Sequence, residues 1–203
     1  MKQNKILYTI LTWIVRPILW VFFPYEVYGK ENIKNLNCGH ILCPNHLSNL
    51  DPIILAVVYP RKICFMGKSE LFKNKFFAVF LNAIGVFAVK RGKNDGRAIE
   101  EAENILKSGK VLGIFIEGTR SKTGEFLRPK SGAAVLAHKN NTKIVPVCIT
   151  GGGKNNKIHI FKKTIIKFNT PINPEELGIR ENSRLEIKSA TNLIMSKIKE
   201  MRD

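Results

Sequence analysis

Short apolar segments and helix-forming segments alternate along this chain from residue 25 to its end. A short apolar run bounded by glycine, proline or charged residues is typical of a buried strand, and apolar residues spaced three and four apart are typical of an amphipathic helix. We expect strands at Tyr25–Tyr28, His40–Cys43, Ile63–Met66, Val86–Val89, Val111–Ile116 and Ile144–Ile149, and a hairpin of Ile158–Phe161 with Thr164–Phe168. We expect helices at Pro52–Tyr59, Leu71–Ala83, Gly96–Lys107 with Asp95 as its cap, Gly132–His138 and Arg184–Met201.

This alternation predicts an α/β fold with a layered, mixed and largely parallel sheet flanked by helices. The run Val111–Ile116 contains no polar side chain, which is typical of a strand covered on both faces. A length of 203 residues fits one domain. Open α/β sheets bind their ligands at the carboxyl ends of the strands, so reactive side chains are expected just after each strand.

The N-terminal segment has a different character. Nearly every residue from Ile6 to Phe23 is apolar, and Arg16 and Pro17 interrupt the run near its middle. A helix of this length spans about 27 Å, close to the roughly 30 Å hydrocarbon core of a bilayer. A central arginine costs roughly 2.5–3.5 kcal/mol on insertion, and an internal proline kinks a helix. We expect residues 1–24 to form a helical membrane anchor and residues 25–203 to form the folded domain.

The anchor has three possible arrangements: a bent hairpin in one leaflet, a single span, or a helix packed on the domain's own core. The interrupted middle favours the first, monotopic arrangement. Tyr8, Trp13 and Trp20 suit the bilayer interface, where a polar tip and an apolar ring are both satisfied. No small-residue cleavage site follows Phe23, so the segment is not expected to be a cleaved signal peptide.

The chain is strongly basic, with 33 Lys and Arg against 16 Asp and Glu and a net charge of +17. Such a charge favours polyanionic partners: nucleic acid, an anionic membrane surface or a phosphorylated substrate. No helix-turn-helix, RNA-recognition or zinc-finger pattern is present, and the aromatic residues lie in apolar runs instead of between cations. We therefore expect no nucleic-acid partner. The mean hydropathy of -0.06 excludes a polytopic membrane protein.

The cysteines and histidines do not predict a metal site. None of Cys38, Cys43, Cys64 and Cys148 forms a closely spaced pair, and no histidine lies at zinc-finger distance from them. We expect four reduced, structural cysteines in an intracellular setting, and no metal or cofactor. His40, His138 and His159 are expected to be structural or exposed.

The first chemically suggestive motif is Asn45-His46-Leu47-Ser48-Asn49-Leu50-Asp51. His46 follows a predicted strand, and Asp51 begins a predicted helix. A tight loop would bring the Asp51 carboxylate to one imidazole nitrogen and leave the other as a general base. The alternative is that Asp51 only caps its helix and His46 is an ordinary loop residue.

Cations and an acid follow two further strands, and another cation precedes a helix. Lys90 and Arg91 end the segment that begins at Gly85, and an arginine fork matches phosphate oxygens. The turn Glu117-Gly118-Thr119-Arg120 follows the buried run at 111–116, and Lys130 precedes a helix N-terminus. Each also has an ordinary interpretation as a solvated basic pair or a polar turn.

The segment Val145-Pro146-Val147 places a proline inside a predicted strand. Proline forfeits a ladder hydrogen bond, so this strand is expected at an edge of the sheet, at a bulge or at a special contact.

Taken in order, these four motifs resemble those of the glycerolipid acyltransferases of the 1-acylglycerol-3-phosphate acyltransferase (PlsC-like) family. The first, second, third and fourth motifs cover roughly residues 40 to 150. The family usually has proline before the glutamate of the third motif, where this chain has Ile116.

The resemblance implies transfer of an acyl group from acyl-CoA or acyl carrier protein to the sn-2 hydroxyl of lysophosphatidic acid, giving phosphatidic acid. It assigns general-base catalysis to His46 and its orientation to Asp51. Asn45 and Ser48 would support them. The remaining implied roles are acceptor phosphate binding by Lys68, Arg91, Arg120 and Lys130, acceptor glycerol positioning by Glu117, Gly118 and Thr119, and an acyl-donor side formed by Val145, Pro146 and Val147.

The resemblance also implies a location on the cytoplasmic face of the cell membrane and an anionic membrane surface as a partner. It leaves open another lysophospholipid or a lyso-aminolipid as acceptor. A non-enzymatic module that binds anionic lipid or nucleic acid is the remaining alternative.

Overall fold

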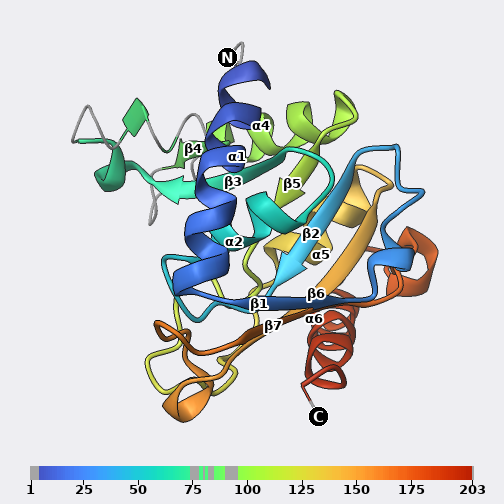
Figure 1. The fold of residues 1–203 in the computed structure, drawn as a ribbon. Helices are drawn as coiled ribbons and strands as arrows, with labels where there is room; N and C mark the ends of the chain where they lie inside the picture. Colours follow the sequence, from blue (N-terminus) through green and yellow to red (C-terminus); the bar gives the residue numbers. More distant parts are fainter. Residues whose placement is uncertain (1–4, 74–77, 80, 82–84, 90–95, 203) are drawn as a thin grey trace.

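The computed structural model describes residues 5–73, 78–79, 81, 85–89 and 96–202. Helices lie on both sides of a central sheet (Figure 1). The strands are β1 (Tyr25–Tyr28), β2 (His40–Pro44), β3 (Ile63–Lys68), β4 (Val86–Val89), β5 (Val111–Gly113), β6 (Lys143–Gly151) and β7 (Thr164–Phe168). The helices are α1 (Lys5–Phe22), α2 (Asp51–Val58), α4 (Gly96–Lys107), α5 (Gly132–Lys139) and α6 (Arg184–Lys199).

The sheet confirms the predicted α/β class. Its strand order within the described residues is β1-β7-β6-β2-β5-β3-β4. Every neighbouring pair is parallel except β6 with β7, which is antiparallel. All five residues of β2 are buried, because this strand is flanked by β5 and β6 and covered on both faces.

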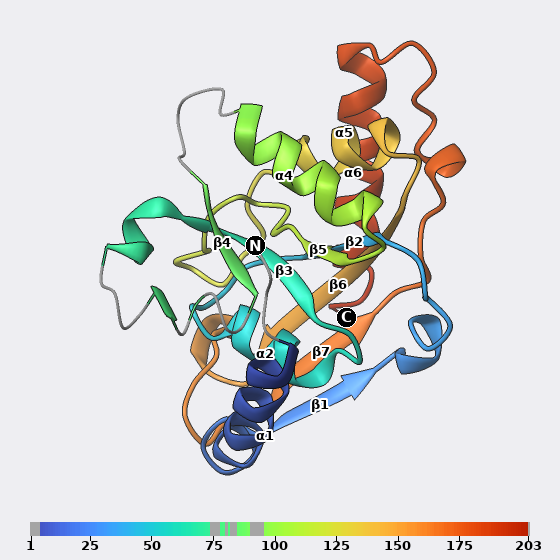
Figure 2. The ribbon, with the colours of Figure 1, turned by 90° about the horizontal axis from the view of Figure 1, so that it is seen from above.

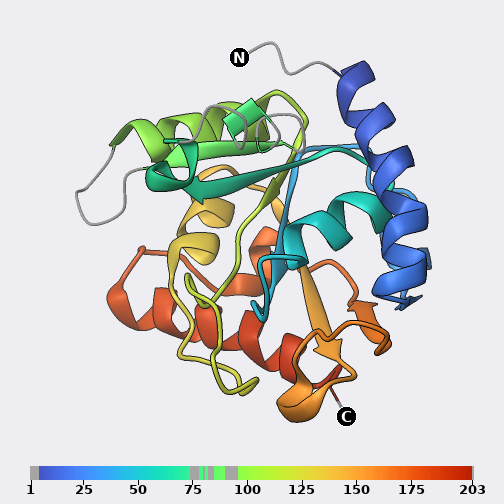
Figure 3. The same cartoon turned by 60° about the vertical axis from the view of Figure 1, so that its left-hand side comes forward.

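Helices α4, α5 and α6 cover one face of the sheet, and α1 and α2 cover the other (Figures 2 and 3). An apolar cluster lies on each face. One contains the inward residues of α4, α5 and α6, and the other those of α1 and α2. Successive residues of β2 belong alternately to the two clusters. Ile41 and Cys43 belong to the first, and Leu42 belongs to the second. This is the two-residue period of a strand buried on both faces.

The predicted late hairpin is wrong. β7 pairs with β6 and β1, and the segment 158–161 forms no strand. The chain turns through a 3₁₀ helix at Lys154–Asn156, and Asn155 and Phe161 both have positive φ. Left-handed backbone cannot join a ladder. The Phe161 amide instead donates to the carbonyl of Phe22 at the end of α1.

Two other expected elements differ in extent. β5 ends at Gly113, although the amides of Ile114 and Ile116 still donate to carbonyls of β2. The chain therefore stays against β2 while it leaves regular strand geometry. A helix was expected at Leu71–Ala83. The structure has a 3₁₀ turn at Ser69–Phe72 where that helix would begin, and much of the remaining segment lies outside the described residues. The Asp95 cap also lies outside them.

The strand with the internal proline lies near the centre of the sheet, so of the three positions expected for it the edge is excluded. Pro146 pairs with Cys43 of β2, and the ladder between β6 and β7 stops at Val147. The missing amide therefore falls where pairing with β7 ends. The carbonyl of Pro146 accepts from the Asn169 amide at 3.0 Å.

Helix α1 runs through Pro17 as one helix, so the expected bent hairpin is not formed. Two hydrogen bonds attach α1 to α2. They offset the backbone hydrogen bond that Pro17 cannot donate. The Tyr8 hydroxyl donates to the Ala56 carbonyl at 3.0 Å, and the Arg16 guanidinium donates to the Val57 carbonyl at 3.0 Å. Arg16 therefore reaches α2 with its guanidinium, although the residue as a whole is exposed.

In the part of the chain that the structure describes, no helix combines the length and the apolar character needed to cross a membrane.

The first testable prediction concerns the contact between β5 and β3. A Cβ added at Gly113 would overlap the buried Phe65 ring. Gly113→Ala should therefore lower the free energy of unfolding by about 1–3 kcal/mol, as overpacked cores do. Urea unfolding checks this. Gly132→Ala is the matched control, since a Cβ there meets nothing within 4 Å. Equal midpoints for the two variants would contradict the packing argument.

Candidate active site

Asn45 joins the end of β2 to β6 through its side chain. Its amide nitrogen donates to the Ile149 carbonyl at 3.0 Å, and its amide oxygen accepts from the Ile149 amide at 2.7 Å. Both groups are fully buried. The side chain thus imitates one more step of strand pairing and fixes the start of the loop that carries His46.

His46 and Asp51 form the pair that the sequence motif predicted. The imidazole Nδ1 lies 2.7 Å from Asp51 Oδ2. The carboxylate can only accept, so Nδ1 carries the proton and Nε2 keeps a lone pair. The His46 side chain is 15% exposed and the Asp51 side chain is fully buried. The geometry supports a general base oriented by a carboxylate.

The Asp51 side chain does not cap its helix. Its Oδ2 atom also accepts from the amides of Leu47 at 2.6 Å and Ser48 at 2.9 Å. Three donors therefore converge on one oxygen and close the loop between His46 and Asp51. The Ser48 hydroxyl accepts from the Leu50 amide, which tightens the same loop. The other carboxylate oxygen of Asp51, Oδ1, has no hydrogen-bond partner among the described residues.

An aromatic stack fixes the face of the imidazole. The Phe115 ring lies 3.8 Å from the His46 ring between centroids, at an interplanar angle of 18°. Phe65 stacks on the other side of Phe115, with centroids 5.6 Å apart. Sequence reasoning gave Phe115 no role, because an aromatic residue in an apolar run looks like any core residue.

The third motif folds onto the first through backbone hydrogen bonds. The Ile116 amide donates to the Pro44 carbonyl at 3.0 Å, and the Ser121 amide donates to the His46 carbonyl at 2.8 Å. Between them Gly118 has φ +67, a conformation that L side chains rarely adopt. The turn thus brings Glu117 and Arg120 to the His46 loop.

Glu117 is a buried acid at this turn. The residue is 2% exposed, and neither carboxylate oxygen has a hydrogen-bond partner among the described residues. Burial raises the pKa of Glu117 to about 7, although the nearby amides of Leu127 and His46 oppose the shift. A buried acid with free oxygens is suited to contact a hydroxyl group of a ligand.

A pocket of about 510 Å³ opens beside His46, and we call it the Arg120 pocket. It is lined by Leu47, Ser48, Asn49, Arg120, Ser121, Lys122, Lys157 and Ile158. Three cations face this space and no acid does, so it favours an anionic group. Sequence reasoning found Arg120 but missed Lys122 and Lys157, since a lone exposed lysine carries no spacing signal.

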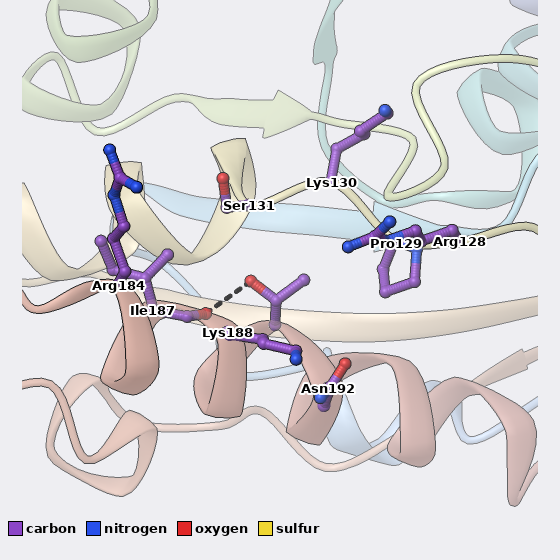
Figure 4. A pocket seen from close by; sticks show the side chains of 9 residues that line it. Arg128, Pro129, Lys130, Ser131, Arg184, Ile187, Lys188 and Asn192 are labelled. Carbon is purple, nitrogen blue, oxygen red and sulfur yellow. Dashed lines mark hydrogen bonds between the residues drawn. The ribbon is translucent and has the colours of Figure 1, made fainter.

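The other predicted cations are distributed differently. Lys68 ends β3, at the carboxyl edge of the sheet. Arg91 lies outside the described residues. Lys130 lines a separate pocket with Arg128 (Figure 4). The structure therefore places Arg120, and not Lys130, in the pocket beside His46.

The fourth motif packs against the strand that leads to the first motif and is hydrogen-bonded to Asn45. Val145 and Val147 are fully buried in the cluster that contains Leu42, and the Val147 carbonyl accepts from the Asn45 amide at 3.4 Å. The predicted acyl-donor role of Val145, Pro146 and Val147 stays a prediction. Thr119 is exposed at the turn.

The predicted structural histidine and cysteines behave largely as expected. His40 is buried, between the Cys38 carbonyl and the Tyr59 hydroxyl. All four cysteines are free, and Cys38 is exposed while the other three are buried.

A carboxylate-oriented imidazole at the carboxyl edge of an α/β sheet, next to a cationic pocket, defines a class of enzyme that activates a hydroxyl for group transfer. Comparisons with known proteins narrow this class. The family model described as Acyltransferase matches residues 24–150. The chain belongs to this acyltransferase family.

Named relatives place it within the family. The chain is 31% identical over 179 residues to the 1-acyl-sn-glycerol-3-phosphate acyltransferase of Bacillus subtilis, covering 87% of each protein. It is 27% identical over 188 residues to the enzyme of that name from Streptococcus pneumoniae, covering 91% of this chain and 70% of the relative.

A solved structure supports the same family assignment as these two relatives. The crystal structure of the 1-acyl-sn-glycerophosphate acyltransferase PlsC from Thermotoga maritima superimposes with a TM-score of 0.72 at 25% identity, covering 97% of this chain and 80% of the other. The protein is an acyltransferase of the group that contains these phospholipid-biosynthesis enzymes.

The second testable prediction follows from buried Glu117. Its pKa rises from the ordinary 4.5 to about 7, so between these values the native acid is protonated while the unfolded acid is ionised. The free energy of unfolding should then fall as the pH rises through this window, by up to about 3 kcal/mol, and level off above it.

Glu117→Gln should remove that part of the pH dependence. Urea unfolding at several pH values between about 5 and about 8 measures it, with the exposed Glu175→Gln as the control. A variant that declines with pH as steeply as the wild type would show that Glu117 is ionised in the native protein throughout.

Proposed function

We propose that this protein is a 1-acyl-sn-glycerol-3-phosphate acyltransferase. It would transfer an acyl group from acyl-CoA or acyl carrier protein to the sn-2 hydroxyl of lysophosphatidic acid and release phosphatidic acid. The observation that carries the proposal is the 2.7 Å contact between His46 Nδ1 and Asp51 Oδ2, which leaves Nε2 free in the loop whose residues 47–49 line the Arg120 pocket.

The reaction requires one base and no acyl-enzyme. Nε2 of His46 accepts the proton of the acceptor hydroxyl while its oxygen attacks the thioester carbonyl. The tetrahedral intermediate collapses, the carbon–sulfur bond breaks, and the imidazolium returns the proton to the departing thiolate sulfur. The buried Asp51 carboxylate stabilises the imidazolium, and the Phe115 stack holds the ring in place.

Two of the four cysteines are poorly suited to form an acyl-enzyme. Burial raises the pKa of the Cys43 thiol and of the Cys64 thiol, and a thiol that stays protonated is a poor nucleophile.

The Arg120 pocket would hold the phosphate of the acceptor. Arg120, Lys122 and Lys157 converge there from two separate segments of the chain. A guanidinium fork and two ammonium groups suit a phosphate monoester. Glu117 would contact the glycerol hydroxyl from the turn behind the pocket, and Lys68 and Arg91 stay predictions for the same phosphate.

The exposed face of α1 would dock the enzyme on the membrane. Trp13 is 78% exposed and Trp20 is 72% exposed, and Ile14 and Ile18 lie on the same helix with about half of their surface exposed. Tyr8 and Arg16 hold α2 through hydrogen bonds to two of its carbonyls. A helix with one face on the protein and one apolar face outward suits insertion into one leaflet.

A second apolar element lies next to the end of α1. Phe161 is 64% exposed, and its ring is 5.8 Å from that of Phe22 between centroids. Lys162 follows it in the sequence, where it would meet anionic headgroups, whereas Lys163 is paired with Glu26 at 2.6 Å. Residues 1–24 would thus form a docking segment, together with this tip, and residues 25–203 would form the catalytic domain on the cytoplasmic face.

The third testable prediction concerns the base. His46→Ala should lower kcat for acyl transfer to lysophosphatidic acid by at least about a hundredfold, because it removes the imidazole that takes the hydroxyl proton. Transfer is measured with both acyl-CoA and acyl carrier protein as donors. The exposed His159→Ala is the matched control and should keep the wild-type rate.

Retained turnover in His46→Ala, with a wild-type unfolding midpoint, would contradict the general-base role. A panel of acceptors tests the substrate with the wild-type enzyme. A preference for a phosphate-free acceptor would refute the phosphate role of Arg120 and with it the proposed acceptor.

The fourth testable prediction concerns docking. The double variant Trp13→Ser and Trp20→Ser should bind vesicles of phosphatidylglycerol and phosphatidylcholine at least about tenfold more weakly, because two large apolar side chains no longer enter the leaflet. Vesicle co-sedimentation measures the affinity. Leu185→Ser with Ile99→Ser is the matched control, since both residues are exposed and apolar on other helices. Equal loss in the control would contradict docking through α1.

A further inference from the structure

A second pocket, of about 440 Å³, shares no lining residue with the Arg120 pocket. We call it the α6 pocket. Figure 4 shows that residues 128–131, which lead into α5, form one side, and that the first half of α6 forms the other. Its lining includes four cations and no acid; the cations are Arg128, Lys130, Arg184 and Lys188.

The cations of this pocket are not neutralised by the protein. Among the described residues, the ion pairs of the C-terminal region join Lys197 to Glu200 and Arg202 to Glu125, and none involves Arg128, Arg184 or Lys188. Like charges gathered around one hollow raise its positive potential and repel each other. An anion bound in the pocket would relieve this repulsion.

Cations line the pocket from both of its sides. Arg184 and Lys188 are four residues apart on α6 and so lie on one face of the helix. In Figure 4 the Arg128 guanidinium approaches the pocket from the facing segment, while Lys130 extends away from α6. Arg128, Arg184 and Lys188 therefore carry the argument, and Lys130 marks the border of the pocket.

Lys130 connects the pocket to the proposed reaction site. Its amide donates to the Ile116 carbonyl at 2.7 Å, and a Cβ at Gly118 would lie 3.3 Å from its Cγ. The turn that it touches carries Glu117 and reaches His46 through the Ser121 amide. A ligand held in the α6 pocket would thus lie behind the same turn that faces the acceptor.

We propose that the α6 pocket binds the phosphate groups at the nucleotide end of coenzyme A. This inference rests on the proposed function, in which a CoA thioester donates the acyl group. The diphosphate and the 3′-phosphate of CoA supply several negative charges, which match three or four cations better than one phosphate monoester does. Arginine forks bind phosphate oxygens in pairs.

The size of the pocket favours a small ligand over the acidic face of a carrier protein. Small-molecule sites are concave and have volumes of roughly 300–1,000 Å³. A stable protein–protein contact instead buries about 800 Å² of each partner over a broad surface. The 440 Å³ hollow belongs to the first kind.

Binding without turnover tests the proposal. Isothermal titration of the full chain with CoA, dephospho-CoA and adenosine 3′,5′-bisphosphate should show binding of all three, with dephospho-CoA at least about fivefold weaker than CoA because it lacks one charge-assisted contact. The double variant Arg184→Gln and Lys188→Gln should raise the Kd for CoA at least about tenfold. It should also raise KM for acyl-CoA and leave KM for lysophosphatidic acid unchanged.

Lys30→Gln with Lys34→Gln is the matched control, because it removes the same charge from exposed positions between β1 and β2. It should change the Kd by less than about twofold. Unfolding midpoints without ligand show whether each variant is folded. An unchanged Kd in the folded Arg184/Lys188 variant, or an equal loss in the control, would overturn the proposal.

The two proposals fail in different ways. If the enzyme transfers acyl groups only from carrier protein and adenosine 3′,5′-bisphosphate does not bind, the α6 pocket is not a nucleotide site, and the acyltransferase proposal stands. If CoA binds through Arg184 and Lys188 but no lysophosphatidic acid is acylated, the pocket proposal stands and the proposed function is wrong.

Discussion

One carboxylate oxygen organises the proposed active site. Asp51 Oδ2 accepts from His46 Nδ1 and from the amides of Leu47 and Ser48, so one buried atom sets the loop shape and the imidazole tautomer together. Because Asp51 begins α2 and Asn45 is fastened to β6, both ends of that loop are attached to rigid elements. A base held in this way loses little freedom on reaching the transition state.

The sequence predicted where the strands and helices lie along the chain better than it predicted which strands pair with one another. Hydrophobic periodicity located most strands and helices, because it reflects local burial. It could not show that β7 would lie between β1 and β6, or that a proline strand would sit centrally, since both depend on pairing between distant segments. In the site, motif spacing predicted the His46–Asp51 pair. The Phe115 stack and the division of Arg120 and Lys130 between two pockets depend on how a turn folds, which spacing does not encode.

The structure also shows where some of the cations behind the net charge of +17 lie. As a composition this charge suggests any polyanion. In the structure, one group of cations lines the Arg120 pocket and a second lines the α6 pocket. Two separate anion-favouring hollows would suit the proposed reaction, in which both substrates carry phosphate.

The attachment of α1 to α2 has a geometric consequence. Tyr8 and Arg16 hold α1 against the C-terminal half of the same short helix that begins with Asp51. A membrane contact made by α1 would therefore set the height and tilt of the imidazole above the lipid surface through a single rigid connection. The enzyme would then work at a fixed depth, and a strongly curved micelle would present the acceptor at a different level from a flat bilayer.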